Sequence, residues 1–581
     1  MIAANYTLIT ATDRPFVYLE GPDGCRLAEL FVLSGVQTQA GLDDATSMNA
    51  WTVTRHPDEV VISLNASSSI WDRKTYRFRC QEQRLLYEIE VYGRGCLTEV
   101  DYFGGYCSAM TRWGSGRFWS GRHFTRGFNP EPTVAETYEF GPSEGAAIDL
   151  CGVPSPGKES WFFTPPPFCF AFETPAGWLG MGIEASAGHN RYTDFRYRTQ
   201  EAGFHLSLAF EGHTNVDGYG LLPAVGIDFG ADPYEVLGSH TASLRRQGHA
   251  PNLHRPKAAW WSEPILCGWG AQCYEAAREG GHAPDYARQH LYEQFLEVLE
   301  GRALSPGIVV LDDKWQATYG ENRADETKWP NLEGFVARQH AAGRKVLLWL
   351  KAWDPEGVPP QECVTNAAGL PIAVDPTHPS YQARLRASVR TMLSADGYDA
   401  DGFKIDFSAR IPSGPGLRRH GDVWGLELMK AYLGIIYDEA KRTKPDALVM
   451  THAPHPYLAD VVDMIRLNDI NTGKDVCAAM THRARLARIA CPDALIDTDN
   501  WPMPDKATWR TYLSLQPDLG VPSLYYVSHI DSTLEALQHD DYELIREMWR
   551  QHRRARQCAD LLDGTVDGML VAAREEAPAA R

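Results

Sequence analysis

Short segments in which apolar and polar residues alternate recur through the first part of the chain. Examples are Phe16–Leu19, Glu59–Leu64, Leu85–Tyr92 and Phe204–Phe210, and glycine, proline, asparagine and aspartate separate them. A period of two is typical of strands with one buried face, and no long helical period appears in this part. The pattern therefore predicts an antiparallel β-sandwich over residues 1–245.

The pattern changes near residue 260, where short apolar runs begin to alternate with amphipathic helical segments. We expect strands at residues 264–269, 307–312, 345–350, 402–406, 448–452, 464–468, 494–497 and 523–527. We expect helices at residues 286–300, 332–340, 381–394, 424–442, 475–489 and 534–557. Eight such units favour a closed (β/α)8 TIM barrel over residues 246–560. An open doubly wound sheet is the weaker alternative, since no glycine-rich loop follows the first strand.

One strand of this predicted barrel carries charged residues. Lys404 and Asp406 lie two residues apart in an apolar run, so a pleated strand points both side chains to the same face. Each is costly to bury alone, so the pair indicates either a structural ion pair or a functional site. The carboxyl ends of barrel strands form the active site in this fold, which favours the functional interpretation.

Ionisable and aromatic residues also follow the other predicted strands. Carboxylates accept hydrogen bonds from hydroxyl groups, and indole rings cover the apolar faces of a sugar, so the set predicts an uncharged, polyhydroxylated ligand. Its members are Trp269, Asp312, Asp313, Trp315, Lys351, Trp353, Asp354, His452, Arg466, Asp469, Asp497, Asp499, Trp501, His529 and Asp531.

Many of these residues also have a structural interpretation. Asp312 or Asp313 could cap a helix. Arg466 and Asp469 could form an ion pair, and Asp499 could belong to a turn. His452 is interpreted as an ordinary core or loop histidine. A metal site formed by His452, His455 and Asp460 is a minor alternative, so we expect a site without metal or cofactor.

Composition narrows the classes of function. The 581-residue chain has 56 Lys and Arg against 75 Asp and Glu, a net charge of -19, which argues against nucleic acid or an anionic membrane as partner. No apolar run has the length of a membrane helix and no signal peptide is visible, so we expect a cytoplasmic protein. The 12 cysteines form no CxxC pair and are expected to be reduced. Residues 561–581 are expected to form a short tail whose last ten residues are disordered.

The carboxylates suggest glycoside hydrolysis. One ionised carboxylate attacks the anomeric carbon, and a second, protonated carboxyl group gives its proton to the leaving oxygen. The two groups must therefore differ in protonation at one pH. We expect Lys404 to keep Asp406 ionised and Asp469, two strands away, to be the protonated partner.

These motifs resemble those of the α-glycosidase clan that contains the melibiase-type α-galactosidases of glycoside hydrolase families 27 and 36 and, more distantly, family 31. The resemblance covers about residues 260–530. Asp312-Asp313-x-Trp315 is similar to the motif that binds galactose hydroxyls after strand 2. Lys404-x-Asp406 is similar to the strand 4 motif whose aspartate is the nucleophile, and Arg466-x-x-Asp469 resembles the strand 6 segment that bears the acid/base aspartate.

The chain departs from the family pattern in places. The strand 6 segment reads Leu-Asn-Asp where the family typically has Ser-Asp, and Trp349-Leu350-Lys351 differs from the usual strand 3 sequence. The β-domain that usually follows strand 8 does not fit in the residues that remain here. Asp499-Asn500-Trp501 is similar to the acid-bearing segment of family 31, so Asp499 is the second choice for the acid/base, although it falls one strand late.

The resemblance implies a retaining exo-α-glycosidase, with α-galactosidase-like activity as the first choice, Asp406 as nucleophile and Asp469 as acid/base. The residues expected to bind sugar hydroxyls are Asp312, Asp313, Lys404 and Arg466, and those expected to wall the ring are Trp269, Trp315 and Trp349. Activity on α-glucosides or α-xylosides, transfer to a sugar acceptor, and an inactive carbohydrate-binding barrel stay open as alternatives. The expected partner is an oligosaccharide or glycoside, and homo-oligomerisation is left open.

Overall fold

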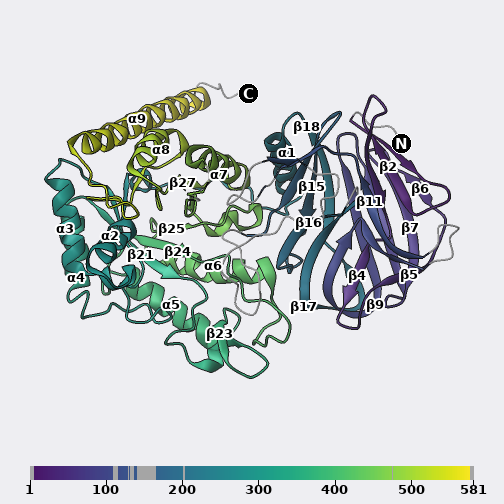
Figure 1. Ribbon diagram of the computed structural model, residues 1–581, viewed down its shortest axis with the longest axis horizontal. Coiled ribbons are helices and arrows are strands. Elements are labelled where there is room, and N and C mark those ends of the chain that lie inside the picture. The colour runs from purple at the N-terminus through teal and green to yellow at the C-terminus, as the bar shows by residue number, and fades with distance from the viewer. Residues whose placement is uncertain are drawn as a thin grey trace, which may run out of the picture.

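The computed structural model describes residues 5–108, 115–128, 130, 137–139, 165–200, 203–470, 472–473 and 475–575. Figure 1 shows a β-rich N-terminal part beside a C-terminal part of mixed strands and helices, arranged along the long axis of the molecule. The change of pattern near residue 260 therefore marks a change of architecture.

The strands of the N-terminal part hydrogen-bond into one continuous set. Among the described pairs, β5 and β10 run parallel and the others run antiparallel, so the predicted antiparallel β-fold is confirmed. The strands are β1 (Thr7–Thr10), β2 (Phe16–Glu20), β3 (Arg26–Phe31), β4 (Gly35–Thr38), β5 (Asp44–Met48), β6 (Thr52–Arg55), β7 (Val60–Ser68), β8 (Arg73–Cys80), β9 (Leu85–Tyr102), β10 (Gly104–Cys107), β11 (Gly116–Arg122), β12 (Arg126–Phe128), β13 (Thr137–Glu139), β14 (Cys169–Thr174), β15 (Gly177–Glu184), β16 (Asp194–Gln200), β17 (Gly203–Leu221) and β18 (Ala224–Gly230).

Strand β9 shows how the alternating pattern produces this part of the fold. Tyr87 and Ile89 are fully buried, whereas Glu88 between them lies on the opposite face. The Tyr87 ring packs against Phe78 and Phe103, with ring centroids 4.8 and 4.7 Å away. A shift of register by one residue would expose these rings, so the apolar pattern fixes which face of β9 points into the core.

The strand-like pattern did not predict helix α1 (Pro233–Arg246), which follows β18. Asp232 accepts hydrogen bonds from the backbone N–H groups of Tyr234 and Glu235 and so caps the helix. Proline is well suited to the first turn, where its missing N–H has no helical partner. The sequence therefore contains a helix-capping signal, but this signal lies among segments that were predicted as strands.

A buried ion network joins α1 to the sheet. Arg84 forms ion pairs with Glu184 and with Asp228, the latter with Nε 3.0 Å from Oδ1. Its NH1 donates to the hydroxyl of Ser243 in α1. His240 of the same helix places Nδ1 3.2 Å from Asp228 Oδ2. Because an unpaired buried charge is costly, each member of this network depends on the others.

The C-terminal part contains eight parallel strands that close into a ring. Each strand pairs with the next in the order β19, β20, β21, β24, β25, β26 and β27, and β28 pairs with β19. Val521 N donates to Ile496 O at 2.7 Å and closes the ring between β27 and β28. The predicted eight-stranded barrel is therefore confirmed. Its strands are β19 (Ile265–Cys267), β20 (Ile308–Leu311), β21 (Lys345–Lys351), β24 (Gly402–Asp406), β25 (Leu448–Thr451), β26 (Met464–Arg466), β27 (Leu495–Asp497) and β28 (Ser523–Leu524).

Helices connect these strands, and a hairpin of β22 (Cys363–Thr365) and β23 (Pro371–Val374) lies in the connection after β21. The α-helices are α2 (Trp269–Glu279), α3 (Gln289–Glu300), α4 (Leu332–Ala341), α5 (Pro379–Leu393), α6 (Gly425–Thr443), α7 (Val476–Ala490), α8 (Lys506–Leu519) and α9 (His539–Glu575). Short 3-10 helices span Ala259–Ser262, Ala283–Tyr286, Pro360–Glu362 and Pro456–Val461. None of the described helices combines the length and apolar character needed to cross a membrane.

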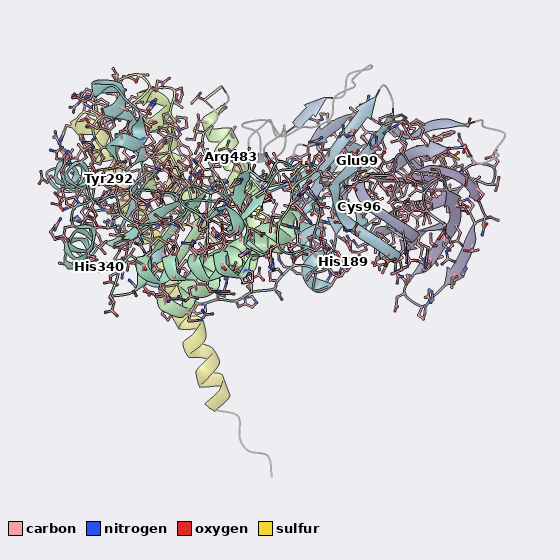
Figure 2. All side chains as sticks on the ribbon, turned by 90° about the horizontal axis from the view of Figure 1, so that it is seen from below. Cys96, Glu99, His189, Tyr292, His340 and Arg483 are labelled. Carbon is pink, nitrogen blue, oxygen red and sulfur yellow. The ribbon has the colours of Figure 1, made fainter. Side chains whose placement is uncertain are left out.

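Three helices differ from the sequence expectation. No helix was predicted at α2 or at α8, although α8 buries Trp509, Leu513 and Gln516 at helical spacing. Helix α9 runs to Glu575, so it includes part of the tail that was expected to be disordered, while residues 576–581 lie outside the described residues. Figure 2 shows the end of α9 extending away from the barrel.

The two parts of the chain contact each other directly. Arg245 of α1 donates to the carbonyls of Ile489 and Ala490 at 2.9 and 3.1 Å. The ring of His213 in β17 stacks on Trp424, with centroids 3.5 Å apart. These contacts place the N-terminal part against α7 and against the loop that leads into α6.

Helix α6 begins directly against the N-terminal part. Leu426 N donates to Tyr192 O at 3.2 Å. Gly425 has a φ of 59°, and a Cβ atom there would lie 2.0 Å from the same carbonyl oxygen. Glu427 accepts hydrogen bonds from the backbone of Gly188 and Asn190. Only glycine at position 425 permits this close approach.

We predict that Arg84→Leu lowers the free energy of unfolding by about 3–5 kcal/mol, because Glu184 and Asp228 would remain buried without their cation. Urea denaturation measures the loss. The matched control is Arg94→Leu, since Arg94 and its partner Asp217 are 85% and 78% exposed and their ion pair should contribute little. Equal losses in both variants would contradict the importance of the buried network.

Candidate active site

A pocket opens at the carboxyl ends of the barrel strands. Its cavity volume is about 110 Å³, which is below the range for drug-sized ligands and restricts the pocket to a small ligand. Eight of the ten site residues predicted from the sequence line it, and Trp315 and Asp499 do not. The lining residues are Trp269, Asp312, Asp313, Trp349, Lys404, Asp406, Phe407, Arg466, Asp469 and Trp501.

The two charged residues of β24 have different partners. Lys404 Nζ lies 2.7 Å from Asp312 Oδ2 and 3.5 Å from Cys267 Sγ. Burial alone would lower the pKa of Lys404, but the charge of Asp312 raises it above its usual value. Lys404 therefore does not form the ion pair with Asp406 that the sequence left open, although its charge still helps to lower the pKa of Asp406, as expected. The pleat puts both side chains on one face, but the longer lysine reaches past β21 to the residue after β20.

Asp406 receives donors from three neighbouring segments. Its Oδ1 accepts a hydrogen bond from Phe407 N at 2.9 Å and lies 3.0 Å from His452 Nε2. Its Oδ2 accepts one from Trp349 Nε1 at 3.2 Å. Burial alone would raise the pKa of this carboxyl group, but Arg466 and His452 outweigh burial and hold the pKa well below its usual range. Asp406 is therefore ionised at neutral pH.

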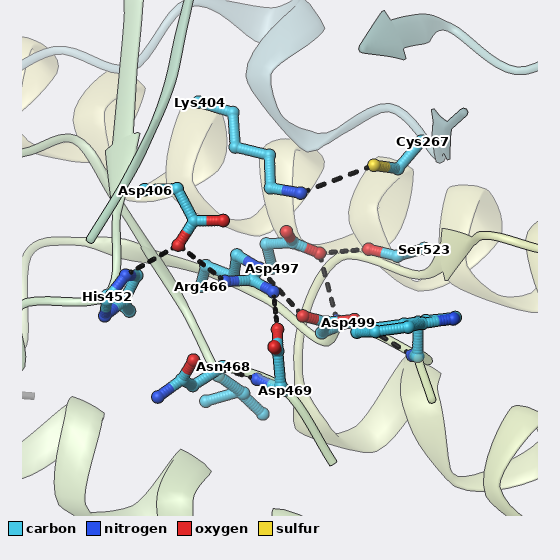
Figure 3. A network of polar contacts seen from close by, with 12 residues as sticks. Cys267, Lys404, Asp406, His452, Arg466, Asn468, Asp469, Asp497, Asp499 and Ser523 are labelled. Atoms are coloured by element: carbon cyan, nitrogen blue, oxygen red, sulfur yellow. Dashed lines mark hydrogen bonds and ion pairs between the residues drawn. The ribbon is translucent and has the colours of Figure 1, made fainter. Parts of the chain in front are cut away.

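One guanidinium group contacts three carboxylates. Arg466 NH1 lies 3.6 Å from Asp406 Oδ1, its Nε lies 2.8 Å from Asp499 Oδ2, and its NH2 contacts Asp469. Figure 3 shows this arrangement, with Asp406 and Asp469 on different sides of the arginine. The Arg466 side chain is only 2% exposed, so these interactions are weakly screened by solvent.

The loop that carries Asp469 is fixed from behind. Arg483 of α7, labelled in Figure 2, donates from NH1 to the carbonyls of Leu467, Asn468 and Asp469 at 3.2, 3.0 and 2.8 Å. The Asp469 side chain remains 36% exposed. The backbone is thus held rigidly while the carboxylate faces the pocket, as an acid/base group requires.

Asp499 is fully buried and lies behind Arg466 instead of lining the pocket. Burial raises the pKa of Asp499 to about 7, and Asp497 also raises it while Arg466 lowers it. Burial likewise raises the pKa of Asp497, whose Oδ1 accepts a hydrogen bond from the Ser523 hydroxyl. A substrate in the pocket would therefore meet Arg466 before Asp499, and this burial favours Asp469 over the second-choice Asp499 as the acid/base.

The adjacent residues Asp312 and Asp313 have different environments. Asp312 N donates to the hydroxyl of Tyr292 at 2.8 Å, and its carboxylate holds Lys404. Asp313 lines the pocket and accepts a hydrogen bond from the Tyr319 hydroxyl at 2.8 Å. Burial raises the pKa of Asp313 to about 7, so near neutral pH this group can either donate or accept a hydrogen bond.

Aromatic rings wall the pocket. Trp269 and Trp501 pack edge to face, with centroids 5.7 Å apart, and Trp349 forms another wall. Trp315 is fully buried, and its indole N–H donates to the carbonyl of Trp349 at 2.8 Å. The prediction that Trp315 walls the sugar is therefore wrong, since it supports Trp349 from behind.

Strained backbone follows the strands that build the site. Left-handed φ angles occur at Lys314, Trp353, Phe407, Asn468 and Asp499, with values of 73°, 67°, 57°, 75° and 44°. Each of these residues lies one to three positions after the end of a barrel strand. Such angles are unfavourable for residues with a side chain and persist only where the surroundings impose them. The strand ends therefore turn sharply to aim their side chains into the pocket.

The sequence analysis assigned no site role to several residues here. His452 contacts Asp406, Trp501 and Phe407 line the pocket, and Tyr319 holds Asp313. Trp501 and His452 follow predicted strands, and this position could have identified them as site residues. Tyr319 and Phe407 lie in connections whose direction depends on the strained turns, and nothing in the pattern indicated them.

The residues of the alternative metal site, His452, His455 and Asp460, each have other partners. His455 accepts a hydrogen bond from Tyr457 N, burial lowers the pKa of His455 to about 3, and Asp460 pairs with Lys430 at 2.9 Å. His452 turns to Asp406 instead. Within the described ranges, no group of three or more histidine, cysteine or acidic side chains is arranged to hold a metal ion.

The chain is similar to known proteins in its three-dimensional structure. No family model and no curated protein sequence matches the chain. A family 31 sulfoquinovosidase from E. rectale has a TM-score of 0.58 at 10% identity and covers 94% of this chain and 82% of its own. An α-galactosidase from Thermus thermophilus, in complex with stachyose, has a TM-score of 0.51 at 13% identity over 86% and 99%. A family 31 dextranase from Flavobacterium johnsoniae, in complex with isomaltotriose, has a TM-score of 0.51 at 12% identity over 96% and 70%.

These similar structures share the architecture of this chain across both of its parts. At 10–13% identity the likeness establishes the fold and no more. All three proteins are named for activity on glycosides, and two of them belong to family 31, which the sequence had suggested only as the more distant resemblance.

We predict that Asp313→Asn reduces the loss of stability as the pH rises. The folded-state pKa of about 7 exceeds the ordinary value of 3.8, so this carboxyl group contributes stability that is present below pH 4 and lost as the pH rises through 7, at up to about 1.4 kcal/mol per pH unit. Urea denaturation between pH 4.5 and 8 measures the difference from wild type.

Asp505→Asn is the control for this prediction. Asp505 caps α8 and is partly exposed, and its pKa is lowered by hydrogen bonds from Thr508. It therefore stays ionised over the whole range, and its replacement should leave the slope unchanged. An unchanged slope in Asp313→Asn as well would show that Asp313 does not titrate as described.

Proposed function

We propose that this protein is a retaining exo-α-glycosidase with Asp406 as nucleophile and Asp469 as acid/base. The observation that supports this most is that Arg466 contacts two pocket carboxylates of different exposure. Asp406 is 19% exposed and ionised, whereas Asp469 is 36% exposed on the pocket wall. Retaining glycosidases need one carboxylate for attack and a second carboxyl group for proton transfer.

The reaction has two displacements. An oxygen of Asp406 bonds to the anomeric carbon as the bond to the leaving oxygen breaks, and that oxygen takes the proton of Asp469. Asp469, now a carboxylate, then takes a proton from water while the water oxygen displaces Asp406. An α-glycoside passes through a β-glycosyl-enzyme and gives an α-product, since two inversions restore the configuration.

The donor pattern supports attack by Oδ2 of Asp406. Oδ1 already faces Phe407 N, His452 Nε2 and Arg466 NH1, whereas Oδ2 accepts one hydrogen bond from Trp349 at 3.2 Å. An oxygen with fewer donors keeps a lone pair available for bond formation.

The pocket shape favours a terminal sugar. The Lys404–Asp312 ion pair is buried at the inner end, and indole rings form the walls. A small pocket walled by indole rings and a buried ion pair suits one terminal sugar better than the middle of a chain. Asp313, Lys404 and Arg466 present hydrogen-bonding groups to hydroxyls of the bound ring.

An α-galactoside is our first choice of substrate. The Asp312-Asp313 doublet supports it, as does the likeness to an α-galactosidase fold. The described lining carries four carboxylates, namely Asp312, Asp313, Asp406 and Asp469, and two permanent cations, Lys404 and Arg466. This charge balance favours a neutral sugar over a sulfonated or uronic one, so α-glucosides and α-xylosides are the next candidates.

We predict that the protein hydrolyses one member of a panel of aryl α-glycosides and that Asp406→Ala lowers its kcat about 1,000-fold or more. Product release followed by absorbance measures the rate, and calorimetry with the free sugar checks that the variant still binds. Sugar binding by wild type without turnover of any glycoside would favour a binding protein instead. Products joined to an added sugar would favour transfer over hydrolysis.

We predict that azide distinguishes the two carboxylates. With Asp406→Ala, azide would attack the substrate directly and give the β-glycosyl azide after one inversion. With Asp469→Ala and a good aryl leaving group, azide would attack the glycosyl-enzyme and give the α-glycosyl azide after two inversions. The anomeric proton coupling in the NMR spectrum identifies each product. The same anomer from both variants would contradict the assigned roles.

A further inference from the structure

Asp499 stands directly behind the proposed catalytic pair and makes two ordered contacts. Its Oδ2 lies 2.8 Å from Arg466 Nε, and its Oδ1 accepts a hydrogen bond from Trp501 N at 3.0 Å. Its side chain has no exposed surface. Asp499 therefore touches one residue that contacts both reacting carboxylates and another that walls the sugar, while remaining outside the pocket itself.

The contact at Nε determines how the guanidinium of Arg466 lies. A guanidinium is planar and rigid, so the ion pair that draws Nε towards Asp499, although it is not aligned as a hydrogen bond, leaves NH1 and NH2 on the sides of Asp406 and Asp469. Without a partner at Nε, the group could rotate towards Asp469, which it already contacts, and away from Asp406, where the separation is 3.6 Å.

Asp499 also takes a share of the positive charge of Arg466. When it is ionised, Asp499 competes with Asp406 and Asp469 for the guanidinium, so neither of them faces the whole of its positive charge. Several other titratable or charged groups face Asp499: Lys404 is engaged by Asp312, burial raises the pKa of Asp497, and burial keeps the tyrosines neutral. These groups are Lys404, Asp469, Asp497, Tyr512 and Tyr525.

We infer that Asp499 is a positioning residue that holds Arg466 between Asp406 and Asp469. This inference rests on the proposed glycosidase function for its catalytic consequence. The part of the inference that concerns the orientation of Arg466 does not depend on the proposed function.

The test compares Asp499→Asn, which keeps the size and the acceptor for Trp501 N, with Asp499→Ala, which removes both contacts. We expect kcat to fall roughly 10- to 100-fold, as for a small misplacement of catalytic groups, with KM changed less than about threefold. We also expect the alkaline limb of kcat/KM in Asp499→Asn to move to lower pH, since losing one acidic neighbour leaves the guanidinium charge of Arg466 less compensated. A residue with only a structural role would not move that limb.

Asp505→Asn is the matched control on the same connection after β27. Asparagine also caps helices, so this variant should keep the wild-type rate and pH profile. An unchanged pH profile and kcat in both Asp499 variants would overturn the inference while leaving the glycosidase proposal intact.

Crystal structures of the two Asp499 variants separate the inference from the proposed function. We expect the Arg466 guanidinium to be displaced by about 1 Å or more towards Asp469 in at least one variant. An arginine that keeps its contacts with both Asp406 and Asp469 in each variant would overturn the inference whatever the wild type hydrolyses. Absence of any glycosidase activity in wild type, with a displaced arginine in the variants, would overturn only the proposed function.

Discussion

The positive charge of the buried Arg466 guanidinium determines how the acidic side chains are arranged at the carboxyl ends of the barrel strands. Asp406, Asp469 and Asp499 all contact Arg466, and Lys404 is occupied by Asp312. The acidic groups outnumber these cations, and burial accordingly raises the pKa values of Asp313, Asp497 and Asp499. Protons therefore complete a charge balance that the cations alone do not reach. A site built this way contains both ionised and protonated carboxyl groups at one pH, as two-carboxylate chemistry requires.

More of the fold than of the site could be predicted from the sequence. Periodicity identified all eight barrel strands, because each is an apolar run buried on both faces. It also placed Asp406 and Asp469 at strand ends. Side-chain partners could not be predicted, since they depend on reach and on turns: Lys404 extends to Asp312, and Trp315 turns beneath Trp349. Helices α1 and α8 were missed because their capping residues and apolar spacing lay in segments already assigned to strands or loops.

The N-terminal part supports the site without lining it in the described residues. Its backbone at Gly188, Asn190 and Tyr192 binds the start of α6, and His213 stacks on Trp424 just before that helix. The segment between Asp406 and α6 is therefore anchored at both ends, by the barrel strand on one side and by the β-rich part on the other. This anchoring links the geometry of the β24 end to the N-terminal part.

The residues with left-handed φ angles after the barrel strands limit how the protein can be engineered. Glycine at Lys314, Trp353 or Asn468 would relieve backbone strain of the order of 1 kcal/mol per position. The same change would free the turn to adopt other directions and loosen the aim of the neighbouring side chains. Selection for heat resistance alone would therefore tend to erode catalysis at these turns, and a library that seeks both properties should leave them fixed and vary the outer helices instead.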